Sequence, residues 1–123
     1  MTKKILIVED DPKSMTLAQD LLKISGYETV KATDGLQGVA MARSSNPDLI
    51  LMDIMMPVMD GYAACREIKT GQTTSKIPVV MLTAVGYDLN RKLATQFGAQ
   101  GYITKPLNRK VLLDTINPLL LNS

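Results

Sequence analysis

The sequence predicts an α/β fold in which a parallel five-stranded sheet carries helices on both faces. Two observations predict it. Short apolar segments with β-branched residues recur at 4–8, 29–32, 49–52, 79–82 and 102–104, and segments with helical spacing separate them. Strict alternation of strand and helix implies a parallel sheet with right-handed crossovers, which places helices on both faces. The expected architecture is therefore a doubly wound (βα)5 sheet.

The strand segments differ in how deeply we expect them to be buried. Segments 4–8, 49–52 and 79–82 are apolar without alternation, which is typical of central parallel strands covered on both faces. Segments 29–32 and 102–104 are less apolar and suit the two edges of the sheet.

The intervening helices are expected at 15–24, 36–42, 62–69, 89–97 and 110–121. Asp11 precedes Pro12 and is expected to cap the first helix, which Gly26 terminates. Asp34 opens the second helix, and Asp60 lies where the third begins. The sequence thus predicts where these helices start.

Pro118 is the awkward residue of the last helix. A proline inside a helix removes a backbone donor and crowds the preceding turn. We therefore expect this helix to kink or stop near Ile116.

Length and composition indicate one globular domain over residues 1–123, because a chain of 123 residues can close one good hydrophobic core. No apolar run approaches the roughly 20 residues that a membrane span needs, so membrane insertion is not expected. The N-terminus is no secretory signal, which favours the cytoplasm. Cys65 is the only cysteine, which excludes an intramolecular disulfide and a cysteine-based zinc site.

Charge and the absence of histidine restrict the chemistry further. The net charge is only +2 and the basic residues are dispersed, so direct nucleic-acid binding is poorly supported. The chain contains no histidine, which excludes histidine-dependent nucleophiles, histidine metal sites and a role as the histidine-bearing donor of a phosphorelay. Any chemistry must use carboxylates, hydroxyls and lysine.

Polar groups follow four of the predicted strands at their carboxyl ends, where open parallel sheets bind ligands. They are Glu9, Asp10 and Asp11 after the first strand, Asp53 after the third, Thr83 after the fourth and Lys105 after the fifth. Converging carboxylates repel one another by about 4 kcal/mol per pair at about 4 Å in a medium of dielectric about 20. A cation would relieve this repulsion, and an oxygen-only ligand set with room for water favours Mg²⁺.

An anion beside that metal would explain Lys105 and the Thr83 hydroxyl, so the pattern indicates a phosphoryl site. A carboxylate can itself accept the phosphoryl group. Asp53 is the better candidate because it stands alone between apolar neighbours at the end of a central strand. Glu9 and Asp10 are adjacent and better suited to hold metal.

Four motifs in chain order resemble the receiver domains of response regulators in two-component systems. They are Val8-Glu9-Asp10-Asp11, Asp53-Ile54-Met55-Met56-Pro57 with Met59-Asp60-Gly61, Leu82-Thr83-Ala84, and Lys105-Pro106. The likeness extends from about Lys4 to Leu121. It implies the flavodoxin-like sheet order 2-1-3-4-5 and a single-domain switch similar to the chemotaxis regulators.

The resemblance also implies roles for the acidic residues. Asp53 would be the phosphoacceptor and a ligand of the metal, and Asp10 a direct Mg²⁺ ligand. Glu9 would hold metal-bound water, and the backbone carbonyl of Met55 would complete the protein ligands.

The other motif residues would respond to the phosphoryl group. Lys105 would pair with its oxygens, and Thr83 would hydrogen-bond to them once they arrive. Small Ala84 would keep the acceptor accessible, and Tyr102 matches the aromatic residue of the family that turns inward as the threonine moves. Pro106 often follows a cis peptide in this family, which sequence alone leaves open.

The expected partners are a histidine kinase or phosphotransfer protein as donor and a downstream effector protein. The effector would bind the face formed by the helix at 89–97, the strand at 102–104 and the helix at 110–121. The chain would be a monomer or a weak, phosphorylation-dependent dimer, and not an enzyme beyond promoting its own phosphorylation and dephosphorylation.

Three alternatives remain at this stage. Phosphatases that resemble the haloacid dehalogenases also use an aspartyl nucleophile, but they carry it in a D-x-D arrangement after the first strand and usually have a cap domain. A receiver-like scaffold that signals without phosphorylation typically lacks the acid pair, the acceptor, the threonine or the lysine, and all are present here. The chain could also be a receiver cut from a larger regulator or hybrid kinase.

Overall fold

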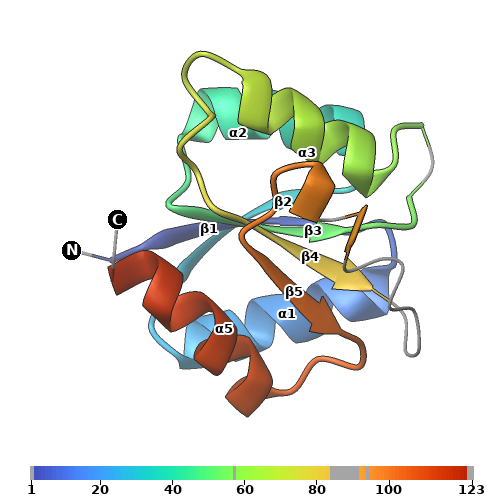
Figure 1. Cartoon of the computed structure of the whole chain (residues 1–123). Coiled ribbons are helices and arrows are strands. Elements are labelled where there is room, and N and C mark those ends of the chain that lie inside the picture. The colour runs from blue at the N-terminus through green and yellow to red at the C-terminus, as the bar shows by residue number, and fades with distance from the viewer. Residues whose placement is uncertain (1, 57, 84–91, 94, 122–123) are drawn as a thin grey trace.

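The computed structural model describes residues 2–56, 58–83, 92–93 and 95–121. Its centre is a parallel sheet of five strands in the order β2-β1-β3-β4-β5 (Figure 1). The strands are β1 (Lys4–Val8), β2 (Glu28–Ala32), β3 (Leu49–Asp53), β4 (Val79–Thr83) and β5 (Gly101–Thr104). The predicted fold class, strand order and edge positions are therefore confirmed.

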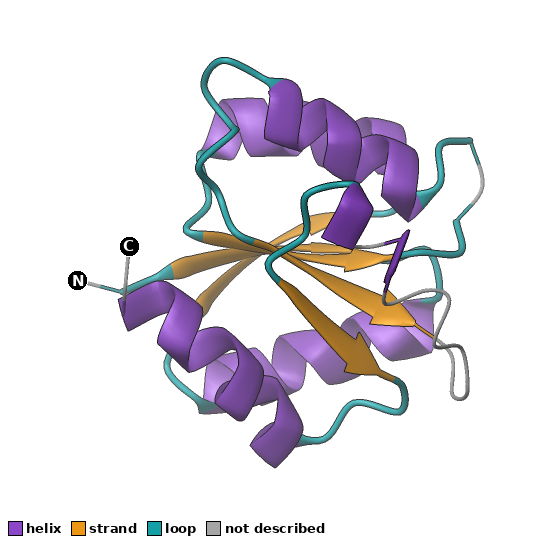
Figure 2. Cartoon of the chain, in the orientation of Figure 1, coloured by secondary structure: helices purple, strands orange, loops and turns teal. Residues whose placement is uncertain are grey.

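The helices lie in two layers, one on each face of the sheet (Figure 2). Their bounds are α1 (Pro12–Ile24), α2 (Gly35–Ser45), α3 (Gly61–Thr70) and α5 (Arg109–Leu121). Helices α2 and α3 cover one face, and α1 and α5 cover the other. Of the helix expected at 89–97, residues 92–93 and 95–96 are helical, and the rest lies outside the described residues except Phe97.

The core consists of two apolar clusters separated by the sheet, because alternate residues of each strand point to opposite faces. Leu6, Ile50 and Met81 point toward α2 and α3, whereas Ile7, Leu51 and Leu82 point toward α1 and α5. Each of these side chains is no more than 1% exposed. Strands β1, β3 and β4 are covered on both faces, as their unbroken apolar sequences predicted.

Three aspartates cap helices at the edge of the sheet where the strands end. The side chain of Asp11 accepts a hydrogen bond from the Ser14 N–H at 3.0 Å, and that of Asp34 accepts one from the Gln37 N–H at 2.8 Å. Asp60 accepts one from the Ala63 N–H at 2.9 Å. The predicted helix starts are confirmed, and Asp11 is thereby assigned to the cap of α1.

We expected a kink or a stop near Ile116, and the stop is wrong, because α5 continues through Pro118 to Leu121. Leu112, Ile116 and Leu120 form a buried stripe that anchors the helix to the core on both sides of the proline. Pro118 lies on the exposed side, where the carbonyl that loses its helical donor can be solvated. Tertiary packing thus outweighs the local cost of the proline.

Candidate functional site

Three carboxylates meet at the carboxyl edge of the sheet, on the right in Figure 1. Glu9 and Asp10 follow β1, and Asp53 ends β3, the strand paired with β1. One oxygen from each of the three carboxylates lies within 4.8 Å of the others. Glu9 is 1% exposed and Asp53 is 6% exposed, whereas Asp10 is exposed to solvent. The structure therefore brings together the three acidic residues that the sequence analysis assigned to metal binding.

Lys105 reaches this acidic cluster from the segment that follows β5. Its Nζ lies 2.7 Å from Oε1 of Glu9 and 3.4 Å from Oδ2 of Asp53. Its backbone N–H donates to the carbonyl of Thr83 at 2.7 Å, which extends the pairing of β4 and β5 by one residue. The Lys105–Pro106 peptide bond is cis.

The local electrostatics follow from burial and from this pairing. Burial raises the pKa of the Glu9 carboxyl and the neighbouring Asp53 carboxyl raises it further, which outweighs the opposite effect of Lys105. Burial alone lowers the pKa of the Lys105 ammonium, but its hydrogen bonds and charge interactions with Glu9 and Asp53 raise that pKa above its usual value. The cluster thus holds more negative charge than its one ammonium balances.

Thr83 and Tyr102, the two predicted switch residues, lie on β4 and β5, the two strands beyond β3. Thr83 ends β4 and is 2% exposed. Tyr102 pairs in register with Met81 and lies partly buried against the apolar cluster beneath α2 and α3. Ala84, which the sequence analysis placed next to the acceptor, lies outside the described residues.

The loop from Ile54 to Asp60 carries the predicted backbone ligand. The Met55 N–H lies 3.4 Å from Oδ1 of Asp53, which places this stretch of backbone beside the Asp53 carboxylate. The Met55 side chain is 77% exposed, as expected if only its backbone has a role at the site. Ile54 of this loop is buried in the core, and Met56 and Met59 pack against it.

Gly61 supports the site in a way that the sequence analysis did not predict. A Cβ at this position would lie 2.3 Å from the carbonyl oxygen of Asp53, and the Gly61 N–H donates to the carbonyl of Ile54 at 2.9 Å. Helix α3 therefore begins in direct contact with the backbone of Asp53. The Asp-Gly pair indicated only a helix start, because this close approach depends on the tertiary fold.

We expect Gly61→Ala to lower the free energy of unfolding by about 1–3 kcal/mol, the usual cost of overpacking a close contact. Alanine has the higher helix propensity, so an isolated helix would become more stable by about 1 kcal/mol. Urea denaturation followed by circular dichroism measures the sign of the change in the free energy of unfolding. An unchanged or increased midpoint would show that the backbone of Asp53 yields to the added methyl group.

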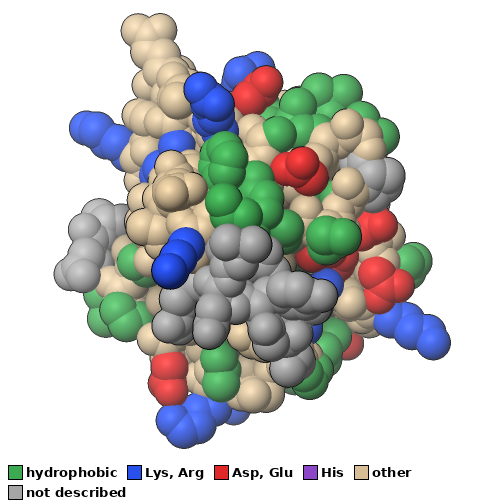
Figure 3. Space-filling model, turned by 45° about the vertical axis from the view of Figure 1, so that its right-hand side comes forward, with side chains coloured by type: hydrophobic (Ala, Val, Ile, Leu, Met, Phe, Trp, Pro, Cys, Tyr) green, Lys and Arg blue, Asp and Glu red, His purple; other side chains and the backbone are tan. Residues whose placement is uncertain are grey.

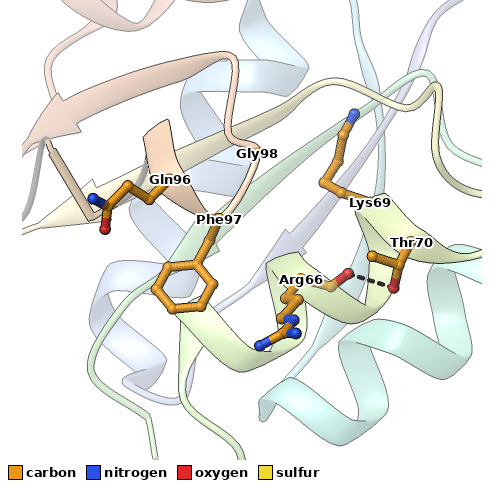
Figure 4. Close-up of a pocket in the computed structure, with 6 residues that line it drawn as sticks. All are labelled: Arg66, Lys69, Thr70, Gln96, Phe97 and Gly98. Atoms are coloured by element: carbon orange, nitrogen blue, oxygen red, sulfur yellow. Dashed lines mark hydrogen bonds between the residues drawn. The ribbon is translucent and has the colours of Figure 1, made fainter.

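A separate hollow lies between α3 and residues 96–98, away from the acidic cluster. It is lined by Arg66, Lys69, Thr70, Gln96, Phe97 and Gly98 (Figure 4). The Lys69 ammonium donates to the carbonyl of Ile77 at 2.9 Å, and the Thr70 hydroxyl donates to the carbonyl of Arg66 at 2.8 Å. None of the residues assigned to the phosphoryl site lines this hollow.

The space-filling view brings the carboxyl edge of the sheet forward (Figure 3). Acidic side chains gather on one side of this face, and hydrophobic side chains lie beside them. Met55 and Val58 are the large hydrophobic residues of the described loop after β3 that remain exposed. Negative charge and apolar surface therefore adjoin at the candidate site.

The donor set of the cluster fits a hard divalent cation. Its three converging groups all offer carboxylate oxygens, which Mg²⁺ prefers, and the exposure of Asp10 leaves room for water in the coordination shell. Glu9, Asp10 and Asp53 are the described residues that would hold such an ion.

A doubly wound parallel sheet of order 2-1-3-4-5, with an acidic cluster and a lysine at its carboxyl edge, defines a protein of the receiver class. The family model for the response regulator receiver domain matches residues 5–117. The chain therefore belongs to the response regulator receiver domain family, whose members are signalling switches of two-component systems and interact with histidine kinases and downstream effectors.

Relatives of similar length support this membership. Protein PilH of Pseudomonas aeruginosa is 39% identical over 117 residues, which are 95% of this chain and 97% of PilH. The polar-differentiation response regulator DivK of Brucella ovis is 38% identical over 120 residues, or 98% of each chain. Among solved structures, the receiver domain of a sensor histidine kinase from Pseudomonas aeruginosa PAO1 is 35% identical over the full length of both chains with a TM-score of 0.89. That structure has a magnesium ion coordinated in its active-site cleft.

No helix in the described part of the chain is both long enough and apolar enough to cross a membrane.

Proposed function

We propose that this chain is a phosphorylation-dependent switch in which Asp53 accepts a phosphoryl group with the help of Mg²⁺. One observation carries the proposal: the carboxylate of Asp53 lies close both to the acidic residues Glu9 and Asp10 and to the ammonium of Lys105. A cation held by the acids and a fixed ammonium would neutralise the oxygens of an incoming phosphoryl group from two sides.

The transfer needs one nucleophile and little further chemistry from the protein. A carboxylate oxygen of Asp53 forms the new bond to phosphorus while the bond between phosphorus and the donor breaks. With a phosphohistidine donor, the imidazole leaves with the bonding electron pair and takes a proton from solvent. With a small acyl phosphate, the carboxylate leaves with that electron pair and stays ionised. Asp53 is held in position by the backbone of β3 and by the contact of its carbonyl with Gly61.

Mg²⁺, when bound, would supply charge neutralisation for the phosphoryl oxygens. Glu9, Asp10 and Asp53 would hold it together with the backbone carbonyl of Met55, a loop residue whose N–H already lies beside Asp53. The magnesium ion reported for the histidine kinase receiver domain supports this assignment. Lys105, whose ammonium lies 3.4 Å from Oδ2 of Asp53, would contribute a hydrogen bond and a positive charge.

The same geometry suggests how phosphorylation changes the surface. A phosphoryl group adds about 1.5–2 negative charges. Thr83, buried at the end of the neighbouring strand β4, would move to donate a hydrogen bond to it, and Tyr102 would turn inward behind Thr83. The effector-binding face would then be the helix at 89–97 with β5 and α5, whose partner affinity changes with the switch.

Membership of the receiver family supports our proposals for the phosphoryl donor, the output and the cellular location of this protein. The donor would be a histidine kinase or phosphotransfer protein, and output would pass through protein contacts rather than through nucleic acid. We propose that residues 1–123 form one domain that works in the cytoplasm as a monomer or as a weak dimer after phosphorylation.

Intact-protein mass spectrometry after incubation with acetyl phosphate tests the proposal. We expect a gain of one phosphoryl group with Mg²⁺ and no gain when EDTA removes the metal, because three carboxylates would otherwise repel the anionic donor. Phosphoryl uptake that is equal with and without Mg²⁺ would contradict the role of the metal. No uptake under either condition would favour a scaffold that signals without phosphorylation.

A further inference from the structure

The tightest charge contact at the site joins Lys105 to Glu9. The distance from Nζ to Oε1 of Glu9 is 2.7 Å, whereas the distance to Oδ2 of Asp53 is 3.4 Å. The Glu9 side chain is 1% exposed and that of Lys105 is 29% exposed. Screening by water is therefore weaker than in a surface pair, so this contact is stronger than the exposed pair of Lys110 and Asp114.

Each carboxylate oxygen of Glu9 accepts a hydrogen bond from within the protein. Oε1 accepts from Lys105, and Oε2 accepts from the Asp11 N–H at 3.3 Å. The hydrogen bond from Asp11 joins residues two positions apart and is long at 3.3 Å. The contact with Lys105 joins residues 96 positions apart in the chain. A metal ion near these acids, or a water molecule bound to it, would therefore compete with the ammonium of Lys105 for the negative charge at Oε1.

We propose that Lys105 acts as an internal competitor of the divalent cation, and that Glu9 sets the strength of this competition. This inference rests on the proposed Mg²⁺ site. The ammonium balances part of the charge of the three acids in the absence of metal, and that interaction must be given up when the metal binds. Glu9 is then a residue that tunes metal affinity as well as a residue that contacts the metal through water.

The length of the Glu9 side chain is central to this role. A carboxylate one methylene shorter at position 9 would keep its charge at the acidic cluster but would not reach Nζ of Lys105 with the backbone in place. Residue 9 is held by a hydrogen bond from its N–H to the carbonyl of Ala32 at 3.0 Å, so its backbone cannot easily move to compensate. The glutamate thus fits the contact with the lysine better than an aspartate would.

The exchange of cations has a consequence for the order of events. Lys105 is withdrawn from Glu9 when the metal arrives, so its ammonium becomes available for the oxygens of a phosphoryl group on Asp53. Metal binding would thereby prepare the lysine for the anion. The site would pair its acids with lysine before metal binding and would pair its lysine with phosphate afterwards.

Isothermal titration calorimetry with MgCl₂ tests this inference on the wild type, Glu9→Asp, Lys105→Met and the double variant. We expect each single variant to bind Mg²⁺ about tenfold more tightly, which is the effect of losing one charge-assisted hydrogen bond. We expect the double variant to bind no more tightly than Lys105→Met, because Glu9 acts through Lys105. Equal affinities in all four proteins, or additive gains, would overturn the proposal.

Lys13→Met is the matched control for charge. Lys13 is exposed on α1 and its charge reaches the same edge of the sheet, but it makes no ion pair with Glu9. Its removal should change Mg²⁺ affinity by less than about twofold. A gain equal to that of Lys105→Met would show general repulsion of the metal and would also overturn the proposal.

Failure of the proposed function gives a different result. The wild type and all variants could bind no Mg²⁺ while their thermal unfolding, followed by circular dichroism, remains cooperative. In that case the proposed Mg²⁺ site is wrong, and so is the proposed competition between Lys105 and the metal. If all bind Mg²⁺ equally, the site stands and only the competition is wrong. Glu9→Asp keeps every charge of the cluster, so its Mg²⁺ affinity still tests the competition if Lys105→Met fails to fold.

Discussion

Replacing Asp53 with asparagine is expected to abolish phosphoryl uptake from acetyl phosphate. The amide has no anionic oxygen to attack phosphorus. Among the described carboxylates of the cluster, only Asp53 and Glu9 are buried and contact the Lys105 ammonium. Glu9 is expected to stay unmodified because its oxygens are engaged by Lys105 and the Asp11 N–H. Intact mass measured over time gives the extent of uptake.

Asp60→Asn provides the control for this change. Asp60 lies on the loop after β3 and caps α3, and asparagine is an equally good cap. This variant should take up one phosphoryl group as the wild type does. Uptake by Asp53→Asn at the wild-type rate would contradict the assignment of the acceptor, whereas loss in both variants would indicate that the loop itself is disturbed.

Lys105→Met should slow phosphoryl uptake by about 100-fold or more at saturating Mg²⁺. Removal of one preorganised donor from a site where charge develops typically costs a factor of about 100–1000. Methionine keeps much of the length and apolar character of the lysine stem, so the change removes mainly the ammonium. The initial rate of acetyl phosphate uptake, followed by mass or by loss of the donor, measures the effect.

Lys110→Met is the corresponding control on α5. Lys110 is exposed and pairs with Asp114 one helical turn away, so its loss should leave the uptake rate within about twofold. If Lys105→Met also retains the wild-type rate, the lysine does not contact the phosphoryl group during transfer. Saturating Mg²⁺ separates this test from any change in metal affinity.

Much of the fold could be predicted from local patterns. Unbroken apolar runs identified β1, β3 and β4 as central strands, and aspartates before helical spacing identified the starts of α1, α2 and α3. These features depend on short stretches of chain in which the hydrophobic pattern and the helix-capping residues agree with the final structure. The rule that parallel strands share one carboxyl edge then predicted which polar residues would lie near one another.

Other features depend on tertiary contacts that no local pattern contains. Pro118 opposed the helix locally, but the buried stripe of α5 on both sides of it kept the helix intact. The contact of Gly61 with the Asp53 carbonyl requires the loop after β3 to fold back onto its own strand. The closer approach of Lys105 to Glu9 than to Asp53 is a contact between residues 96 positions apart, which only the tertiary fold brings together.

Identification of the phosphorylated residue distinguishes Asp53 from the other carboxylates of the cluster. After reaction with acetyl phosphate and Mg²⁺, borohydride reduces an aspartyl phosphate to homoserine, and peptide mass spectrometry locates the change. We expect homoserine at position 53 in the Mg²⁺-treated sample and none in the sample treated with EDTA. Homoserine at position 10, or reduction at no position despite phosphoryl uptake, would contradict the claim that Asp53 is the acceptor.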